Sequence, residues 1–385
     1  MKRILSAVLA AIFLAACAPQ VPDVTGTATL QIPEVTAIAA TETVAPQRAS
    51  MVDLQYAEQF TMETRADGCT LVTIAGSDRF LVVPEGQDAP VVDADVTVLQ
   101  QPLANIYIAA TSAMCLFDGL DALDNIAFSG TKQDGWSIAN ARDAMTRGDI
   151  VYAGKYNAPD YELLLANKCG LALESTMLTH APEVKEKLEA LGIPVLMERS
   201  SYETHPLGRT EWIKLYGLLT GKLALAEELF AAQAAHLDAL SAASTGQIVA
   251  FFHISSNGNA VVRRSGDYVT TMLTLAGGQY AFPDTGGGSA TGTVNLNMEQ
   301  FYAAAKNADV LIYNSAIDGE LRTLAEFLGK SPLLADCKAV QSGNVWCTGK
   351  NMFQETTEFG LMMTEMNRVF TGDADDALRF FHRLR

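Results

Sequence analysis

Polar, aromatic and charged residues follow short apolar runs in both halves of this sequence, and their types suit the recognition of a small anionic molecule. The runs cover residues 105–112, 170–177, 193–202, 248–258, 309–316 and 344–350. Arginine presents a planar fork that matches carboxylate or catecholate oxygens, and tyrosine stacks or donates a hydrogen bond. The candidate ligand-binding residues are Trp136, Lys155, Tyr156, Glu174, Thr176, Arg199, Ser200, Ser201, Tyr202, Arg263 and Arg264.

The arginines have a second interpretation. Arg199 lies close to Glu198 and Glu203 in the sequence, so it can pair with either carboxylate instead of with a ligand. Arg263 and Arg264 are adjacent, and adjacent side chains of an extended segment point to opposite sides. We therefore expect only one of these two arginines to meet a ligand.

The apolar runs predict an α/β fold with two lobes. Continuous apolar runs that alternate with helical patterns are typical of parallel strands buried on both faces, and ligands of such sheets bind outside the carboxyl ends of the strands. Residues 221–244 have a helical apolar spacing, and a helix of that length spans roughly 30 Å. We predict two parallel-sheet α/β lobes, 59–220 and 245–385, joined by this single long helix with a ligand cleft between them. The alternation over residues 60–86 predicts a β-hairpin addition at the N-terminus of the first lobe.

The first part of the chain has the composition of an export signal followed by a tether. Two basic residues, a short apolar run and small residues predict a secretory signal peptide over residues 1–16. The sequence Leu-Ala-Ala-Cys at 14–17 resembles the bacterial lipobox, in which Cys17 is the lipidated first residue, and an ordinary signal with an incidental cysteine is the alternative. An acyl chain would anchor the protein to the cell membrane, facing outside the cytoplasm. Residues 17–58 are expected to form a flexible, lipid-anchored tether.

Charge and cysteine spacing argue against several classes of partner. The formal net charge is −17, and nucleic acids and anionic membrane surfaces both require basic patches, so neither is expected as a partner. Five cysteines follow Cys17, and no C-x-x-C pair indicates a zinc or redox site. A disulfide between Cys337 and Cys347 is left open, because the odd count leaves at least one thiol free. The five are Cys69, Cys115, Cys169, Cys337 and Cys347.

Two segments in the two halves resemble each other. Residues 159–176 and 296–315 each have an acidic residue early in a predicted helix, then an apolar face, a short turn and a buried strand. Glu162 and Glu299 occupy the matching places, although the second segment is longer between the glutamate and the strand. An acidic residue in a first helical turn is also favoured by the helix dipole alone.

The order of these segments resembles the periplasmic-binding-protein family of ABC importers for iron-siderophores, haem and cobalamin. The likeness covers residues 99–370 and is strongest over 152–222 and in "NADVLIYNSAIDGEL". It implies two α/β lobes bridged by one long helix, with the ligand clamped between them. It also implies an ABC permease and ATPase as partners, with one glutamate per lobe docking on arginines of the permease. Glu162 and Glu299 match those positions.

These observations predict an extracytoplasmic substrate-binding lipoprotein of an ABC importer. A basic cleft on an acidic protein favours an anionic iron complex, either a ferric siderophore or haem, over cobalamin. A monomer is expected, with no resident cofactor or metal and no enzymatic activity, since no G-x-S-x-G elbow occurs.

Several alternatives stay open. The protein could bind cobalamin, or it could bind free zinc or manganese through His180, His205 and His253. Either His205 or His253 is also a possible axial ligand of haem. Two alternatives from other classes of protein are a secreted hydrolase and a purely structural lipoprotein.

Overall fold

The computed structural model describes residues 50–240, 244–285, 291–375 and 378–385. The chain divides into two compact units, Met1–Ala45 and Pro46–Arg385, and every described residue lies in the second unit. The expected signal peptide, Cys17 and most of the expected tether lie outside the described residues, so these expectations stay predictions.

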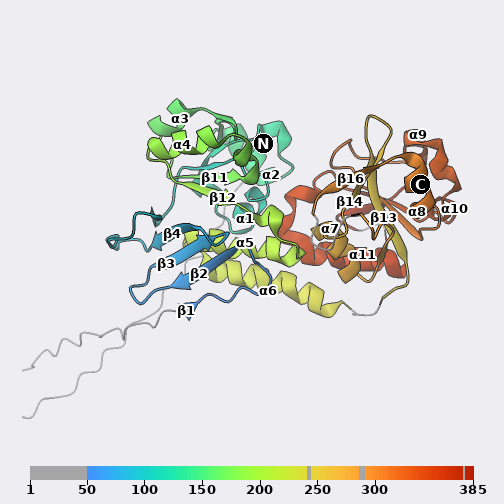
Figure 1. Ribbon diagram of the computed structural model, residues 1–385, viewed down its shortest axis with the longest axis horizontal. Helices are drawn as coiled ribbons and strands as arrows, with labels where there is room; N and C mark the ends of the chain where they lie inside the picture. Colours follow the sequence, from blue (N-terminus) through green and yellow to red (C-terminus); the bar gives the residue numbers. More distant parts are fainter. Residues whose placement is uncertain (1–49, 241–243, 286–290, 376–377) are drawn as a thin grey trace, which may run out of the picture. The chain divides into compact units, whose positions relative to one another are not determined.

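The first lobe is built on a five-stranded parallel sheet in the order β12-β11-β6-β7-β8. Apolar layers cover both faces of this sheet, because successive side chains of a strand point to opposite sides. Figure 1 shows α3 and α4 on one side of it and α5 on the other. The elements are β6 (Ile106–Ile108), α1 (Met114–Gly119), β7 (Ile126–Ser129), α2 (Ala139–Arg147), β8 (Val151–Tyr152), α3 (Tyr161–Ala166), β11 (Leu171–Ser175), α4 (Pro182–Ala190) and β12 (Val195–Glu198).

The second lobe contains a seven-stranded sheet in the order β16-β14-β13-β17-β18-β19, with β15 paired to β13. Strands β13, β15, β17 and β18 are parallel, as predicted, while β14 and β19 run antiparallel to their neighbours in the parallel set. The elements are β13 (Ile248–Ile254), β14 (Ala260–Arg263), α7 (Tyr268–Leu275), β15 (Gln279–Tyr280), β16 (Thr293–Leu296), α8 (Met298–Ala305), β17 (Val310–Tyr313), α9 (Leu324–Lys330), α10 (Lys338–Gln341), β18 (Val345–Thr348), α11 (Phe359–Thr371) and β19 (Phe381–Arg383).

A separate five-stranded sheet precedes the first lobe, and the hairpins predicted over residues 60–86 are present in it. Positive φ angles at Gly68 and Gly76 make the two tight turns, a conformation that glycine adopts without steric cost. One face of the sheet packs on α5, where the rings of Phe60 and Trp212 meet edge to face with centroids 4.8 Å apart. The strands are β1 (Ser50–Met51), β2 (Phe60–Thr64), β3 (Thr70–Ile74), β4 (Asp78–Val83) and β5 (Val96–Gln100).

Two consecutive helices, α5 (Pro206–Leu219) and α6 (Leu223–Ala239), connect the lobes. The structure places α6 within the segment 221–244 that was predicted to be helical. Helix α6 packs on α5 and also on α11 of the second lobe (Figure 1). At Gly360 of α11, an added Cβ would lie only 2.2 Å from the carbonyl oxygen of Gln233, so this close helix contact requires glycine.

Residues 50–59 are folded against α5, although the sequence assigns residues up to 58 to the flexible tether. The buried carboxylate of Glu211 accepts hydrogen bonds from the backbone N–H groups of Gln55, Tyr56 and Ala57 at 2.7–2.9 Å. The Glu203 carboxylate accepts hydrogen bonds from the backbone N–H groups of Glu58 and Gln59. The tether prediction is therefore wrong for this segment, because two carboxylates about 150 residues away satisfy its backbone donors.

The five described cysteines are all free and buried, so the disulfide left open between Cys337 and Cys347 is not formed. Burial raises the pKa of each of these two thiols to about 11. Cys337 precedes α10 and Cys347 lies within β18, and both contribute to the apolar core of the second lobe. Buried cysteine behaves here as a small apolar side chain.

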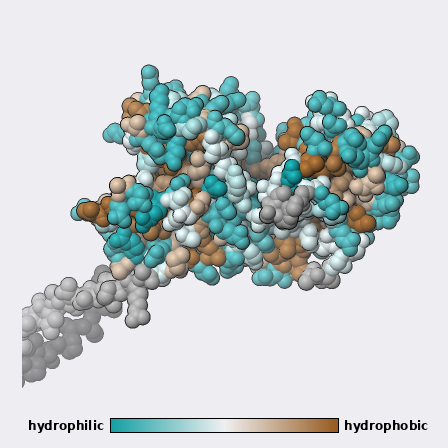
Figure 2. Space-filling view, viewed as in Figure 1, coloured by the Kyte–Doolittle hydropathy of each residue, from teal (hydrophilic) through white to brown (hydrophobic). Residues whose placement is uncertain are grey.

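The face of the molecule in Figure 2 is mainly hydrophilic, with small separate hydrophobic areas. Apolar side chains of the described residues gather instead in the cores of the two lobes and the N-terminal sheet. Among the described helices, none combines the length and the apolar character needed to cross a membrane.

Replacing Glu211 tests whether the segment 50–59 is part of the fold. We expect Glu211→Ala to lower the free energy of unfolding by about 3 kcal/mol, because it leaves buried Lys214 without its carboxylate and three N–H groups without an acceptor. Urea denaturation followed by tryptophan fluorescence measures this change. Glu228→Ala, at an exposed position of α6, is the control, and equal stability of both variants would contradict the prediction.

Candidate functional site

A cavity of about 410 Å³ lies at the carboxyl ends of the first-lobe strands, as expected for a parallel sheet. We call it the first-lobe cavity. Two lysines and two tyrosines contribute to it, and none of the described residues that line it carries a carboxylate. Its lining residues are Ala109, Thr111, Gly130, Thr131, Lys132, Tyr152, Lys155, Tyr156, Ser175 and Met177.

The short hairpin of β9 (Gly154–Lys155) and β10 (Ala158–Pro159) positions part of this lining. Gly154 has φ +87°, and an added Cβ would lie 2.3 Å from the carbonyl oxygen of Ala158, so only glycine fits. The Tyr107 hydroxyl donates a 3.0 Å hydrogen bond to the Gly154 carbonyl and ties the hairpin to β6. On the other side of the cavity, the Lys132 ammonium lies 5.7 Å from the centroid of the Tyr152 ring.

A second cavity of about 790 Å³ lies between the lobes, and we call it the inter-lobe cavity. The loop after β7 forms its first-lobe wall, and the segments after β17 and β18 form its second-lobe wall. Trp136 is part of the first wall, although its ring is buried and its Nε1 donates to Ser129 Oγ at 3.1 Å. The lining residues are Gln133, Asp134, Gly135, Trp136, Ser137, Arg142, Ala316, Glu320, Lys350, Asn351 and Gln354.

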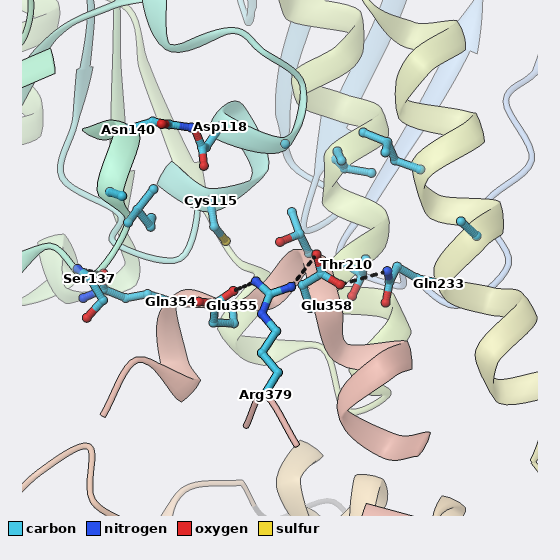
Figure 3. A pocket seen from close by; sticks show the side chains of 17 residues that line it. Cys115, Asp118, Ser137, Asn140, Thr210, Gln233, Gln354, Glu355, Glu358 and Arg379 are labelled. Atoms are coloured by element: carbon cyan, nitrogen blue, oxygen red, sulfur yellow. Dashed lines mark hydrogen bonds and ion pairs between the residues drawn. The ribbon is translucent and has the colours of Figure 1, made fainter. Parts of the chain in front are cut away.

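A third cavity, the hinge cavity, lies beside α5 and α6 and has a volume of about 410 Å³ (Figure 3). Arg379 reaches across its wall to Glu355 at 3.0 Å and Glu358 at 3.3 Å, so this cation is already paired. Burial raises the pKa of the Cys115 thiol to about 11. The hinge cavity shares Ser137 and Gln354 with the inter-lobe cavity, so the two spaces are neighbours.

The structure brings several of the residues selected from the sequence to these cavities. Lys155 and Tyr156 line the first-lobe cavity, and Trp136 lines the inter-lobe cavity. Thr176 follows β11 between two lining residues and is half-buried. Their role in ligand binding remains a prediction.

The segment after β12 does not line any of the three cavities. Ser201 and Tyr202 are exposed, and the Arg199 guanidinium stacks over the Tyr202 ring at 4.6 Å. The buried Nε of Arg199 and the Oγ of Ser200 have no hydrogen-bond partner among the described residues. The carboxylates of Glu198 and Glu203 are occupied by other donors, so the alternative pairing of Arg199 with them is not formed.

The adjacent arginines of the second lobe have different surroundings, as their extended backbone predicts. Arg263 lies 4.8 Å over the Phe353 ring and 3.6 Å from the Asp267 carboxylate. Arg264 is half-buried and approaches the carbonyl oxygen of Thr285 at 3.5 Å. Neither lines the three cavities.

Glu174 is fully buried, so in this structure its carboxyl group is not open to a ligand. Neither carboxyl oxygen has a hydrogen-bond partner among the described residues. Burial alone raises its pKa to about 8, because the charged form loses its hydration. Glu174 precedes Ser175 in β11, and Ser175 lines the first-lobe cavity whereas Glu174 does not.

Glu162 and Glu299 are exposed in the first turns of α3 and α8. Helix α3 follows β8 and the β9–β10 hairpin, and α8 follows β16. Strand β14 is antiparallel to both β13 and β16, so β16 runs in the same direction as β13. Both helices therefore begin on the side of their sheet where the parallel strands end. This is the same edge that carries the first-lobe cavity.

The three histidines considered as metal ligands lie in different elements. His205 precedes α5, where its Nδ1 accepts from the Leu207 N–H and its ring stacks on Tyr56 at 4.3 Å. His253 is in β13 of the second lobe, and burial, followed by the nearby Arg263, lowers its pKa. His180 ends a short 3₁₀ turn in the first lobe. Within the described ranges, no group of three or more His, Cys, Asp or Glu side chains is arranged to hold a metal ion.

Sequence reasoning missed Lys132, Tyr152, Lys350 and Gln354 as cavity residues. Tyr152 ends β8, which has only two residues, and Lys132 lies in the loop after β7, which ends at Ser129. The run "NIAFSG" before Lys132 had the same apolar-to-polar pattern as the six selected runs. Lys350 ends the selected run 344–350 and was recognisable by the same rule.

Comparison with known proteins identifies relatives that cover most of the folded unit. Residues 109–352 match the periplasmic binding protein family. The chain is 22% identical over 283 residues to the uncharacterized lipoprotein MJ0878 of Methanocaldococcus jannaschii, a match that covers 70% of this chain but only 64% of that protein. It is 23% identical over 349 residues to the lipoprotein MJ0872 of the same organism, covering 86% of this chain and 87% of that protein.

Solved structures share the fold at low sequence identity. The periplasmic haem-binding protein HutB of Vibrio cholerae has a TM-score of 0.55 at 18% identity, and the match covers 68% of this chain and 98% of HutB. The haem-binding protein RhuT of Roseiflexus sp. RS-1 has a TM-score of 0.52 at 18% identity, and the match covers 71% of this chain and 99% of RhuT. The TroA-like protein FepB of Veillonella parvula has a TM-score of 0.55 at 14% identity, and the match covers 74% of this chain and 96% of FepB. The predicted two-lobe α/β fold is thereby confirmed.

The buried acid Glu174 predicts a dependence of stability on pH. Its folded-state pKa of about 8 lies above the ordinary value of 4.5, so the folded state holds the proton more tightly. The stabilisation is complete below pH 4.5 and is lost as the pH rises toward 8, with a slope of up to about 1.4 kcal/mol per pH unit.

We expect Glu174→Gln to remove this loss, so that the variant becomes progressively more stable than the native protein between pH 5 and pH 8. Urea denaturation at unit pH steps measures the difference. Glu186→Gln, at an exposed position of α4, should leave the slope unchanged. Parallel pH profiles for native protein and Glu174→Gln would show that the buried carboxyl group has an ordinary pKa.

Proposed function

The chain belongs to the periplasmic binding protein family, and on that premise we propose that it is the extracytoplasmic substrate-binding lipoprotein of an ABC importer for an anionic iron complex. The single observation that carries the proposal is the first-lobe cavity, whose lining contains Lys132 and Lys155 and no carboxylate. The chain as a whole has a net charge of −17. Two lysines that form no ion pair with any residue described by the structure would concentrate an anionic ligand in this cavity.

The aromatic lining supports the choice of ligand class. Tyr152 and Tyr156 stand beside the two lysines in the same cavity, and this combination suits a flat or ring-containing anion. Ferric siderophores and haem are often anionic, whereas cobalamin is not. HutB and RhuT, which share the fold, are haem-binding proteins, and this supports the same class.

In this proposal the inter-lobe cavity completes the binding site. Its lining adds Arg142 and Lys350, although Asp134 and Glu320 balance these charges. We therefore assign the anionic groups of the ligand to the first-lobe cavity and its remaining surface to the inter-lobe cavity. The protein would release its ligand chemically unchanged and act as a monomer.

Binding is tested by quenching of tryptophan fluorescence, since Trp136 lies in the wall of the inter-lobe cavity. The folded unit, residues 46–385, is titrated with haemin, a ferric tris-catecholate, a ferric hydroxamate and cobalamin. We expect saturable quenching by one of the three iron complexes. The double variant Lys132→Ala, Lys155→Ala should bind that complex about tenfold or more weakly and with a reduced dependence on salt.

Lys185→Ala is the matched control, because Lys185 lies on α4 and pairs with Glu189 away from the cavities. Binding of cobalamin alone would favour the neutral ligand of the same family. Binding of free zinc or manganese alone would replace the proposed function by transport of a metal ion.

We further propose that Glu162 and Glu299 dock on the permease and that Cys17 carries the lipid anchor. The support is that both glutamates are exposed, one in each lobe, on helices that begin at the same edge of their sheets. Exposed carboxylates in these positions are free to pair with arginines of a membrane partner. The names of the two lipoprotein relatives support the anchor.

Docking is separable from ligand capture. We expect Glu162→Ala with Glu299→Ala to reduce uptake of radiolabelled iron complex at least tenfold in cells that contain the importer, with the affinity of the isolated protein unchanged. Glu186→Ala with Asp336→Ala, one exposed acidic residue in each lobe, should keep normal uptake. Loss of affinity in the first pair would place these glutamates in the ligand site instead.

A further inference from the structure

A short segment of the second lobe, residues 351–358, reaches the first lobe, and we call it the cross-lobe segment. Its Thr356 carbonyl accepts a 2.7 Å hydrogen bond from the buried Thr210 hydroxyl of α5. At Gly119 of α1, an added Cβ would lie 3.2 Å from the Thr357 methyl group. This end of the segment is therefore packed tightly beside the hinge cavity.

Gln354 makes the contact of this segment that lies nearest to the inter-lobe cavity. Its Oε1 accepts the Ser137 N–H at 2.7 Å, and its Nε2 donates to the Gly135 carbonyl at 2.9 Å. Both polar atoms of one side chain thus bind the backbone of the opposite lobe. Gln354 and Ser137 line both the inter-lobe and the hinge cavity, so the bonded pair stands between the two spaces; Figure 3 shows both residues in the wall of the hinge cavity.

The second lobe holds Gln354 from several directions. The Gln354 N–H donates to the Asn351 carbonyl at 2.7 Å, and the Asn351 side chain donates to Glu355 at 2.7 Å. Glu355 in turn pairs with Arg379. Met352, two residues before Gln354, is buried in the core. The glutamine amide is therefore presented by a well-supported backbone.

On the first lobe, the bonded backbone belongs to the loop that forms the wall of the inter-lobe cavity. Gln133, Asp134 and Gly135 are exposed, and the buried Trp136 side chain anchors the loop to the lobe. The Gln133 side chain also donates to the Arg142 carbonyl of α2 at 3.1 Å, while the Gly135 carbonyl and the Ser137 N–H are bonded by Gln354 of the second lobe. A bond from the opposite lobe to Gly135 and Ser137 therefore sets where the wall stands.

We propose that Gln354 is a positioning residue for ligand binding, because its amide fixes the first-lobe wall, residues 133–137, against the second lobe at the inner end of the inter-lobe cavity. The inference rests on the proposed function, since it assigns this cavity to the ligand. When both hydrogen bonds are made, the wall is held at one distance from Lys350 and Asn351 on the opposite side. When they break, the inter-lobe and hinge cavities merge and the ligand loses a defined wall.

Two variants test the proposal. Gln354→Leu keeps the size of the side chain and removes both hydrogen bonds, while Gln354→Asn keeps the amide but is one methylene too short to span the gap. Hydrogen exchange read by mass spectrometry reports on the Ser137 N–H without any ligand. We expect both variants to exchange at this position about tenfold faster and to bind the iron complex about tenfold more weakly, mainly through faster dissociation.

Gln100→Leu is the matched control, because the Gln100 amide bonds only to nearby backbone of the N-terminal sheet. It should change neither measurement. Unchanged exchange at Ser137 in both Gln354 variants overturns the proposal, even if the native protein binds its ligand. Faster exchange with unchanged affinity and dissociation rate also overturns it, because the contact would then be structural only.

Failure of the native protein to bind any of haemin, the ferric catecholate, the ferric hydroxamate or cobalamin would refute the proposed function, and with it the assignment of Gln354 to ligand binding. The exchange measurement separates this case from the others. It shows independently whether the glutamine holds the wall.

Discussion

The burial of helix α5 on nearly all its sides is the constraint on which the rest of the folded unit depends. A helix that is buried around most of its circumference needs neighbours on most of its sides. Trp212 packs on the N-terminal sheet, Tyr216 tilts against Phe117 of the first lobe, and Thr210 bonds to the second lobe. Helix α6 covers a further side. Each part of the unit therefore takes its position from the same 14-residue helix.

The same burial explains why the segment before the first hairpin is folded. Helix α5 carries Glu211 and Lys214 into the interior, and a buried ion pair alone recovers little of the cost of desolvation. Backbone N–H groups from residues 55–57 and the Asp53 carbonyl supply the missing hydrogen bonds. The polar groups of α5 are thus satisfied by residues 53–57, and this segment packs the beginning of the described chain against the centre of the unit.

The sequence predicted those features that depend on local pattern. Apolar runs located the longer parallel strands, and the rule that polar residues follow strand ends placed Lys155 and Tyr156 at the first-lobe cavity. The same rule did not bring Arg199 to a cavity, because stacking on Tyr202 decides its direction. Lys132 was missed although it follows β7, whose apolar run ends in a polar residue like the selected runs. Contacts between distant segments, such as those of Glu211 and Gln354, have no local signal at all.

These distant contacts also determine how the cavities relate to one another. The close approach of Gly360 to α6 and the bond from Thr210 to the cross-lobe segment fix the two lobes beside the hinge cavity. Packed contacts of this kind resist translation, because interiors are close-packed. The loop around Gly135 and Ser137 lies at the boundary between the fixed region and the cavity. A single glutamine at that boundary links the position of the lobes to the shape of the proposed binding site.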